Sequence, residues 1–355
     1  MSKKLRQVTD GIHGTIYLSE LESELISTPY FYRLHDIYQS STVYMTFPNN
    51  RTKRYEHSLG TMELASRMLF SSVANAASDT RDLLFEKLMT IFEDISKAVQ
   101  KGEKCEQLYF NKAQGTIDNF FDEIREQSGV DLIIHMKNVI KSCDFLDTAL
   151  DFYQYYPTKC TGDHNTNKNN AEYVFLYRCL LQAIRIVGLF HDVGHPPYSH
   201  IIEKVLEELY ETLDKDCNIK WNKTKTERFR QCLQPYFAKK QKNAFKCERL
   251  LCKSSLIESQ PHERIGLGLL SYAIDYVIPP KILNIIESDY ENDEKLAHVL
   301  YYITVVEFAF AILTEKDIFF KSFHKIVDGS IDADRLDYIV RDSKKQWRRL
   351  GRYTL

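Results

Sequence analysis

The segment Phe190–His200 (FHDVGHPPYSH) holds the densest group of side chains able to bind a metal or transfer protons. Its candidates are His191, Asp192, His195 and His200. The apolar stretch before it, 173–190, predicts a helix that ends at the His-Asp pair, because Gly194 and two prolines stop helices. Imidazole and carboxylate at one point suit Mn, Fe, Ni, Co or Zn, and Mg less well. The segment therefore predicts a site for one divalent transition metal.

A second segment, Arg54–Gly60 (RYEHSLG), places Arg54 and His57 three residues apart at the start of an expected helix. Residues three apart share a helical face. His57 could therefore bind the metal while Arg54 points at a bound anion. Taken alone, the pair also fits an ordinary surface salt bridge.

A third segment, Ile331–Asp342 (IDADRLDYIVRD), carries a metal-binding candidate, Asp334. If it is helical, a carboxylate, a phenol ring and a guanidinium follow one stripe, formed by Asp334, Asp337 or Tyr338, and Arg341. The apolar face would consist of Leu336, Ile339 and Val340. The stripe suits a metal ligand followed by groups for sugar and phosphate, and by itself it also fits an exposed charged face.

A fourth segment, Pro261–Gly266 (PHERIG), opens another helical run with His262 and Glu263. A neighbouring carboxylate raises the basicity of an imidazole, so the two residues are candidates for a proton-transfer pair.

Periodicity in the rest of the chain predicts a mainly α-helical fold. Apolar residues recur at helical spacing in 84–99, 117–124 and 176–187. Strand-like alternation is rare: Thr42–Phe47 (TVYMTF) is the best candidate strand, and Gly14–Leu18 is a second one. We therefore expect a short β-hairpin element near the N-terminus.

The bulk composition restricts the function classes. The 355 residues carry a net charge of −2 and are 44% hydrophobic, so the whole chain is not a polycation that coats nucleic acid. We expect no membrane span, because no run of about 18 apolar residues occurs, and the charged segment 1–10 does not resemble a secretory signal. Eight scattered cysteines without a CxxC pair indicate reduced thiols. These features predict a cytoplasmic protein, or a nuclear one in a eukaryote.

Two segments are predicted to be insertions into a single domain, 1–355, whose core blocks are about 8–78, 171–210 and 256–342. The first insertion, 79–170, is expected to be helical. The second, 211–255, contains a basic stretch, 220–253, with eight Lys and three Arg against two Glu and with interleaved aromatic residues. This stretch is either a solvated amphipathic helix pair or a surface that binds nucleic acid or a partner protein.

The order of these residues, H…HD…D, resembles that of the HD superfamily. The strings around them are similar to those of the dNTP triphosphohydrolases within it, over roughly 8–70, 172–206, 258–275 and 325–342. The strings are DGIHGTIYL (Asp10–Leu18), TPYFYRLHDIYQ (Thr28–Gln39), FPNNRTKRYEHSLG (Phe47–Gly60), HDVGHPPYSH (His191–His200) and IDADRLDYIVRD (Ile331–Asp342).

The resemblance implies a role for each candidate residue. The metal ligands would be His57, His191, Asp192 and Asp334. His195 would lie beside the α-phosphate, with His262, next to Glu263, as its partner in proton transfer. The triphosphate would contact Arg54, His200 and Arg335, the last standing where the family has lysine. The deoxyribose would contact Tyr338 and Asp342, with Gln39 near the sugar edge.

The implied reaction is attack of water, activated by the ion, on the α-phosphorus of a deoxynucleoside triphosphate, giving a deoxynucleoside and tripolyphosphate. By the same resemblance the ion could be manganese, the chain would form a homo-oligomer, and dNTP depletion could serve antiviral defence.

Two alternative functions remain. One is an HD phosphodiesterase or nuclease acting on a cyclic nucleotide, an alarmone or a single strand, which the basic stretch favours. The other is a non-catalytic subunit that senses nucleotides.

Overall fold

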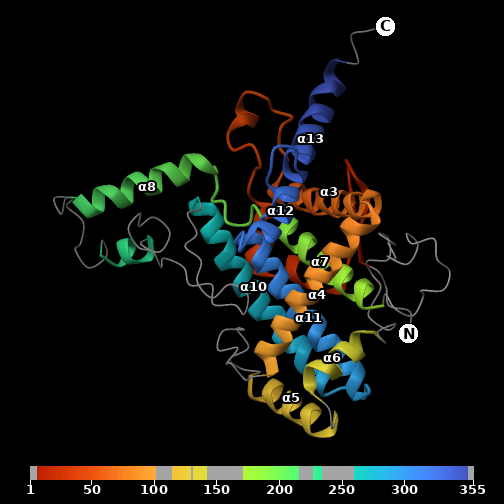
Figure 1. The fold of residues 1–355 in the computed structure, drawn as a ribbon. Helices are drawn as coiled ribbons and strands as arrows, with labels where there is room; N and C mark the ends of the chain where they lie inside the picture. The colour runs from red at the N-terminus through yellow and green to blue at the C-terminus, as the bar shows by residue number, and fades with distance from the viewer. Residues whose placement is uncertain are drawn as a thin grey trace.

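Helices form nearly all of the regular structure in the computed structural model, which describes residues 6–100, 114–128, 131–141, 171–215, 227–233 and 260–350 (Figure 1). The longer helices are α3 (Arg54–Asn75), α4 (Ser78–Gln100), α5 (Gln114–Ser128), α6 (Leu132–Lys141), α7 (Ala171–Phe190), α8 (His200–Lys215), α10 (Pro261–Ile286), α11 (Asn292–Leu313), α12 (Ile318–Val327) and α13 (Ala333–Leu350). Short ones are α1 (Glu20–Ile26), α2 (Pro29–Tyr32), η1 (Arg33–His35) and η2 (Val43–Met45). The predicted mainly α-helical fold is thus confirmed.

Helix α7 lies at the centre of the core and packs against α3, α4, α6, α11 and α12. From Phe175 to Phe190 every one of its residues except Arg178 is buried, because apolar side chains occupy almost its whole circumference. A helix that is apolar all round is stable only when other helices cover it. This packing holds the C-terminal end of α7, and the His-Asp pair behind it, in a fixed place inside the bundle.

A two-stranded hairpin near the N-terminus is the sheet found in the described part of the chain. Strand β1 (Arg6–Asp10) pairs antiparallel with β2 (Gly14–Leu18), and Val8 faces Ile16 across the ladder. The expected second strand, Gly14–Leu18, is therefore confirmed. Ile16 is fully buried, so the hairpin lies against the helical core.

The prediction of a strand at Thr42–Phe47 is wrong. Val43–Met45 form the 3-10 helix η2, in which the Met45 amide donates to Thr42 O at 2.9 Å and the Thr46 amide to Val43 O at 3.1 Å. The alternation of Val43, Met45 and Phe47 placed them on one side, but all three are exposed. Without a neighbouring strand or a core to cover, their backbone groups are satisfied locally instead.

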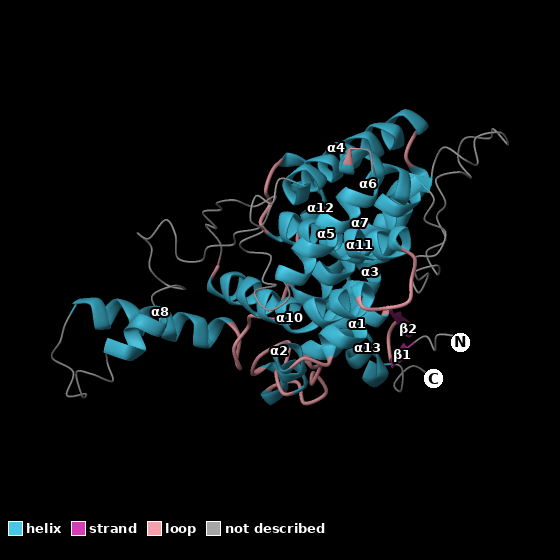
Figure 2. Ribbon diagram, turned by 90° about the horizontal axis from the view of Figure 1, so that it is seen from below, coloured by secondary structure: helices cyan, strands magenta, loops and turns pink. Residues whose placement is uncertain are grey.

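Part of the first predicted insertion shares the core of the protein. Helix α4 packs against α6 and α7, α5 against α10, and α6 against α7 and α11. Residues 101–113 and 142–170 of that segment lie outside the described residues, as does most of the basic stretch 220–253. Helix α8 extends away from the rest of the bundle (Figures 1 and 2).

Among the described residues, three helices have the length and mean hydropathy of a membrane span, so our expectation of no such segment was too strict. They are α7, α10 and α11, and the most apolar windows of α7 and α11 are 83% and 78% buried inside the protein. In α7 the sequence also places Arg185, whose charge is neutralised by Glu22. Packing in the helical core accounts for the apolar character of α7 and α11, whereas only 44% of the corresponding window of α10 is buried.

Candidate metal centre and its cavity

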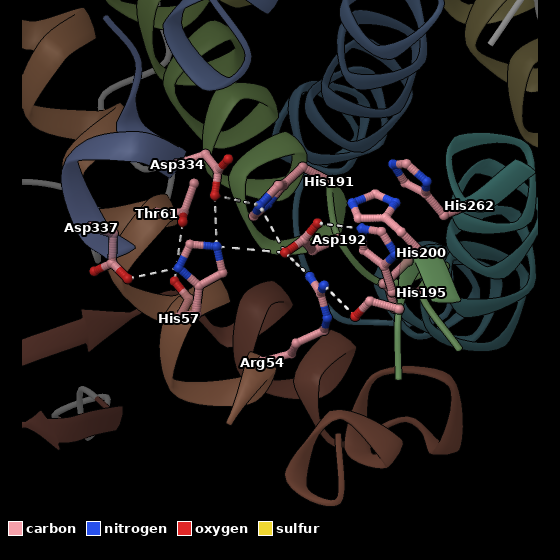
Figure 3. Close-up of polar contacts among 12 residues, drawn as sticks. Arg54, His57, Thr61, His191, Asp192, His195, His200, His262, Asp334 and Asp337 are labelled. Carbon is pink, nitrogen blue, oxygen red and sulfur yellow. Dashed lines mark hydrogen bonds and ion pairs between the residues drawn. The ribbon is translucent and has the colours of Figure 1, made fainter. Parts of the chain in front are cut away.

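Four side chains from three separate parts of the chain converge at the end of α7. His57 lies in the second turn of α3, His191 and Asp192 directly follow α7, and Asp334 opens α13 (Figure 3). One potential ligand atom from each lies within 4.8 Å of all the others. His57 Nε2 is 2.7 Å from Asp334 Oδ1 and 3.5 Å from Asp192 Oδ2, and His191 Nε2 is 3.5 Å from each of these two oxygens.

The donor atoms of this cluster fit a divalent metal ion. His57 Nε2, His191 Nε2 and Asp334 Oδ1 are buried and have no hydrogen-bond partner, although buried polar atoms in proteins are nearly always paired. A shared cation would satisfy all three at once. Two imidazoles and two carboxylates suit the borderline transition metals. The four residues predicted as ligands are therefore brought together in a form that could hold such an ion.

The electrostatics of the cluster point the same way. Burial alone lowers the pKa of His191, but the Asp192 and Asp334 carboxylates outweigh it and hold that pKa well above its ordinary value. Burial alone raises the pKa of Asp334, and its contacts with His191 and His57 instead hold it well below the usual range. Carboxylates that stay ionised while buried next to imidazoles favour a cation, which would displace the imidazole protons.

Backbone and arginine contacts orient the ligands that follow α7. His191 Nδ1 lies 2.8 Å from the carbonyl oxygen of Gly188, which leaves Nε2 facing the cluster. Arg54 had been expected to contact an anion. It is almost fully buried, pairs with Asp192 and donates to Ser199 Oγ at 2.7 Å. In this structure Arg54 therefore fixes the Asp192 carboxylate, one of the four candidate ligands.

A second cluster surrounds Glu203, which the sequence reasoning missed. Its carboxylate lies 2.7 Å from His195 Nδ1, 3.1 Å from His262 Nδ1 and 3.2 Å from His200 Nδ1. The rings of His195 and His262 stack at 3.9 Å, and His195 Nε2 is 3.2 Å from Asp192 Oδ1. Burial raises the pKa of Glu203, but His195 and His262 hold it well below its ordinary range. The spacing of Glu203 and His200, three apart on a helix, was the available signal.

The expected pairing of His262 with Glu263 is not what the structure shows. Glu263 Oε2 accepts the Gln260 backbone amide at 2.8 Å and completes a capping box at the start of α10. Neighbouring residues on a helix point about 100° apart, so one cannot easily reach the other.

Gly194 allows the turn after α7 to approach α10, because a Cβ there would lie 1.9 Å from the His262 carbonyl oxygen.

A cavity of about 970 Å³ opens beside both clusters. The predicted site residues that line it are Gln39, Arg54, His191, Asp192, His195, His200, His262, Glu263, Asp334 and Tyr338. His57 lies behind the wall of the cavity and is fully buried. Arg335 and Asp342 do not line it. Arg335 follows Asp334 directly, so its side chain points to another side of α13 than the cavity. It is half exposed and donates to the Ser330 carbonyl oxygen at 3.1 Å.

The orientation of α13 reverses part of the expected pattern. Asp337 and Arg341 are buried, whereas Leu336, Ile339 and Val340 are 37%, 50% and 40% exposed. The charged stripe of α13 is therefore not the exposed face that its sequence also fits. The polar side is buried instead because it finds charged partners on α3 and on the hairpin.

A helical fold that joins H…HD…D residues in one cluster is typical of an HD-type phosphohydrolase. Comparison with known proteins gives partial similarity to this class. The chain is 40% identical over 65 residues to the deoxynucleoside triphosphate triphosphohydrolase SAMHD1 of Bos taurus, covering 18% of this chain and 11% of that protein. It is 43% identical over 61 residues to SAMHD1 of Homo sapiens, covering 17% and 10%. No protein-family model matches the chain.

A third relative is the uncharacterized protein MJ1154 of Methanocaldococcus jannaschii, which is 42% identical over 64 residues, or 18% of this chain and 14% of that protein. The chain thus matches only a small part of the length of each relative. Together, the partial similarity and the metal-ligand cluster indicate an HD-type phosphohydrolase.

Proposed function

We propose that this protein hydrolyses deoxynucleoside triphosphates to deoxynucleosides and tripolyphosphate with one divalent transition metal. The observation that carries the proposal is the cluster of His57, His191, Asp192 and Asp334 at the wall of a cavity that is also lined by the three histidine partners of Glu203, His195, His200 and His262. The volume of that cavity is typical of small-molecule sites. The similarity to the dNTP triphosphohydrolase SAMHD1 supports this choice of substrate.

The four ligand residues would hold the ion, which when bound supplies Lewis acidity at the scissile phosphate. The chain's own residues supply the remaining chemistry. Glu203 occupies Nδ1 of His262 and of His195, so proton exchange with the departing 5′-oxygen is left to an Nε2 atom. The exposed His200 would meet the phosphates, and Tyr338 would pack against the deoxyribose.

The first test is product analysis. Purified protein is incubated with Mn²⁺, Mg²⁺, Fe²⁺, Co²⁺ or Ni²⁺ and with each dNTP, each NTP and a single-stranded oligonucleotide, and the products are separated by chromatography. We expect tripolyphosphate and deoxynucleoside from dNTPs, little product from NTPs, and none after chelation of the metal. Equal cleavage of ATP and dATP would contradict the role of Tyr338 at the sugar.

One alternative, an HD phosphodiesterase or nuclease, is favoured by the net charge of +9 that follows from eight Lys, three Arg and two Glu in 220–253. Shortened oligonucleotides in the same assay, with dNTPs intact, would support it. Tight dNTP binding without turnover under all metals would instead support a nucleotide-sensing subunit.

The variant His262→Gln separates proton transfer from metal binding. We expect its hydrolysis rate to fall about 100- to 10,000-fold, the usual contribution of a general acid. Its metal content, measured by mass spectrometry, should equal that of the wild type if the ion is held by His57, His191, Asp192 and Asp334, since His262 belongs to the separate group of His195, His200 and Glu203. A parallel loss of metal would show that His262 is a ligand or a structural support.

A further inference from the structure

The motif Asp10–Gly14 (DGIHG) at the tip of the hairpin has no role in the proposed reaction, and its side chains do not line the cavity. Yet it contacts the metal centre through one carboxylate, that of Asp337. His13 Nε2 lies 2.6 Å from Asp337 Oδ1, and His57 Nδ1 lies 2.7 Å from Asp337 Oδ2. The hairpin lies beside α13 in the fold (Figure 2).

Arg341 completes the group and ties it to the hairpin a second time. Its Nε donates to Asp337 Oδ2 at 2.5 Å, its Nη1 to Asp10 Oδ2 at 2.8 Å, and its Nη2 to the Glu56 carbonyl oxygen at 2.9 Å. Asp10 Oδ1 also accepts the backbone amides of Ile12 and His13, both at 2.8 Å. The polar atoms of Asp337, Arg341 and Asp10 thus satisfy one another away from solvent.

Gly60 on α3 is an independent sign that the protein makes room for this group. A Cβ at Gly60 would lie 1.9 Å from Asp337 Oδ1 and 2.4 Å from Arg341 Nη2. Any side chain at this position, one turn after His57, would have to displace the carboxylate of Asp337 and the guanidinium of Arg341 from their places beside α3. The glycine in RYEHSLG therefore serves the contact between α3 and α13.

The contact with Asp337 determines which nitrogen of His57 faces the metal cluster. In the neutral ring of His57, Nδ1–H donates a hydrogen bond to Asp337 and the lone pair is on Nε2, the atom next to Asp192 and Asp334. A histidine that binds a metal usually donates a hydrogen bond from its other ring N–H to such a carboxylate. This bond orients the ring and makes it a stronger ligand. Asp337 lies one turn after Asp334, so the same contact also fixes the register of that ligand.

We propose that Asp337 is a positioning residue for the metal centre, and that the N-terminal hairpin, through His13 and Asp10, is part of the same support. The group formed by Asp337, Arg341, His13 and Asp10 sets the affinity of the cluster for its ion without touching that ion. The proposal rests on the metal site of the proposed function but not on the identity of the substrate.

The test measures Co²⁺ affinity by titration of the ligand-field absorption of the metal-free protein, in competition with a chelator. We expect Asp337→Asn to weaken Co²⁺ binding about 10- to 100-fold, the usual effect of an outer carboxylate. Asparagine still accepts from His57 but has lost its charge. His13→Ala should weaken binding, and His13→Gln should restore it, because the glutamine amide can donate to Asp337. A merely structural role would not separate the last two variants in this way.

The matched control is Lys344→Ala, which removes an exposed contact of 3.5 Å between α13 and the Gly11 carbonyl oxygen but leaves Asp337 untouched. Its Co²⁺ affinity should equal that of the wild type. Urea unfolding of each metal-free variant checks that it folds. If Asp337→Asn does not fold, the comparison of His13→Ala with His13→Gln tests the proposal. Wild-type affinity in Asp337→Asn and His13→Ala would overturn the proposal and leave the proposed function standing. Weakened Co²⁺ binding in these variants, together with a wild type that does not hydrolyse dNTPs, would support the positioning role of Asp337 and overturn the proposed function.

Discussion

Replacing Asp334 with alanine is expected to abolish metal-dependent hydrolysis. Asp334 supplies one of two carboxylates in the cluster and lies 2.7 Å from His57 Nε2 and 3.5 Å from His191 Nε2. An outer partner of a metal ligand typically contributes about 10- to 100-fold to affinity, so loss of a ligand should cost more than about 100-fold. The measurements are metal content by mass spectrometry and turnover of dNTPs at a fixed Mn²⁺ concentration.

The stability of the same variant gives a second readout. A ligand that binds only the folded state stabilises it by RT ln(1 + [L]/Kd). Added Mn²⁺ should therefore raise the melting temperature of the wild type but not that of Asp334→Ala. The control for metal content is Asp328→Asn, an aspartate that lines the cavity outside the cluster. A full metal complement in Asp334→Ala would contradict the assignment of this ligand.

Replacing Arg185 with alanine is expected to cause the largest loss of stability. Arg185 is 1% exposed at the centre of α7 and pairs with both oxygens of the fully buried Glu22, at 2.5 and 2.8 Å. It also donates to Ser66 Oγ at 2.9 Å and to the Tyr17 carbonyl oxygen at 2.7 Å, so it joins α1, α3 and the hairpin. Removing one partner of a buried pair leaves an unpaired charge and costs about 3–5 kcal/mol.

Urea denaturation of the metal-free protein measures this loss. The comparison is Lys97→Ala, since Lys97 lies 3.4 Å from Asp94 in a pair on α4 whose two side chains are 49% and 61% exposed. Exposed pairs contribute at most about 1 kcal/mol. The double variant Arg185→Met with Glu22→Leu should recover much of the stability, because it removes both charges together. Equal losses from Arg185→Ala and Lys97→Ala would show that the buried network contributes little.

The helical core was predictable because its signal is local. Apolar residues at helical spacing identify α4, α5 and α7, since burial of one face requires that period. The strand prediction at Thr42–Phe47 failed for the opposite reason. Alternation in a sequence shows only that a strand could have two different faces, and whether a partner strand exists depends on distant residues.

The residues of the site also differ in whether the sequence alone could identify them. The residue types made His57, His191, Asp192 and Asp334 candidates, and the resemblance of their order to the HD superfamily joined them into one ligand set, which the structure brings together. Glu203 and Asp337 were not assigned their roles. For Glu203 the helical spacing to His200, three residues away, was a signal, although its partner His262 is 59 residues away. The partner of Asp337, His57, is 280 residues away, and no spacing rule links positions so far apart.

By itself, the sequence determined that the protein is mainly helical and which side chains could bind a metal, because both depend on residue type and short spacing. Only the tertiary structure decided which charged face of α13 is buried, which carboxylate holds each histidine, and that the hairpin reaches the metal centre. A buried charge is stable only beside a partner, and the partners of Asp337 come from α3 and the hairpin, which meet only in the folded chain.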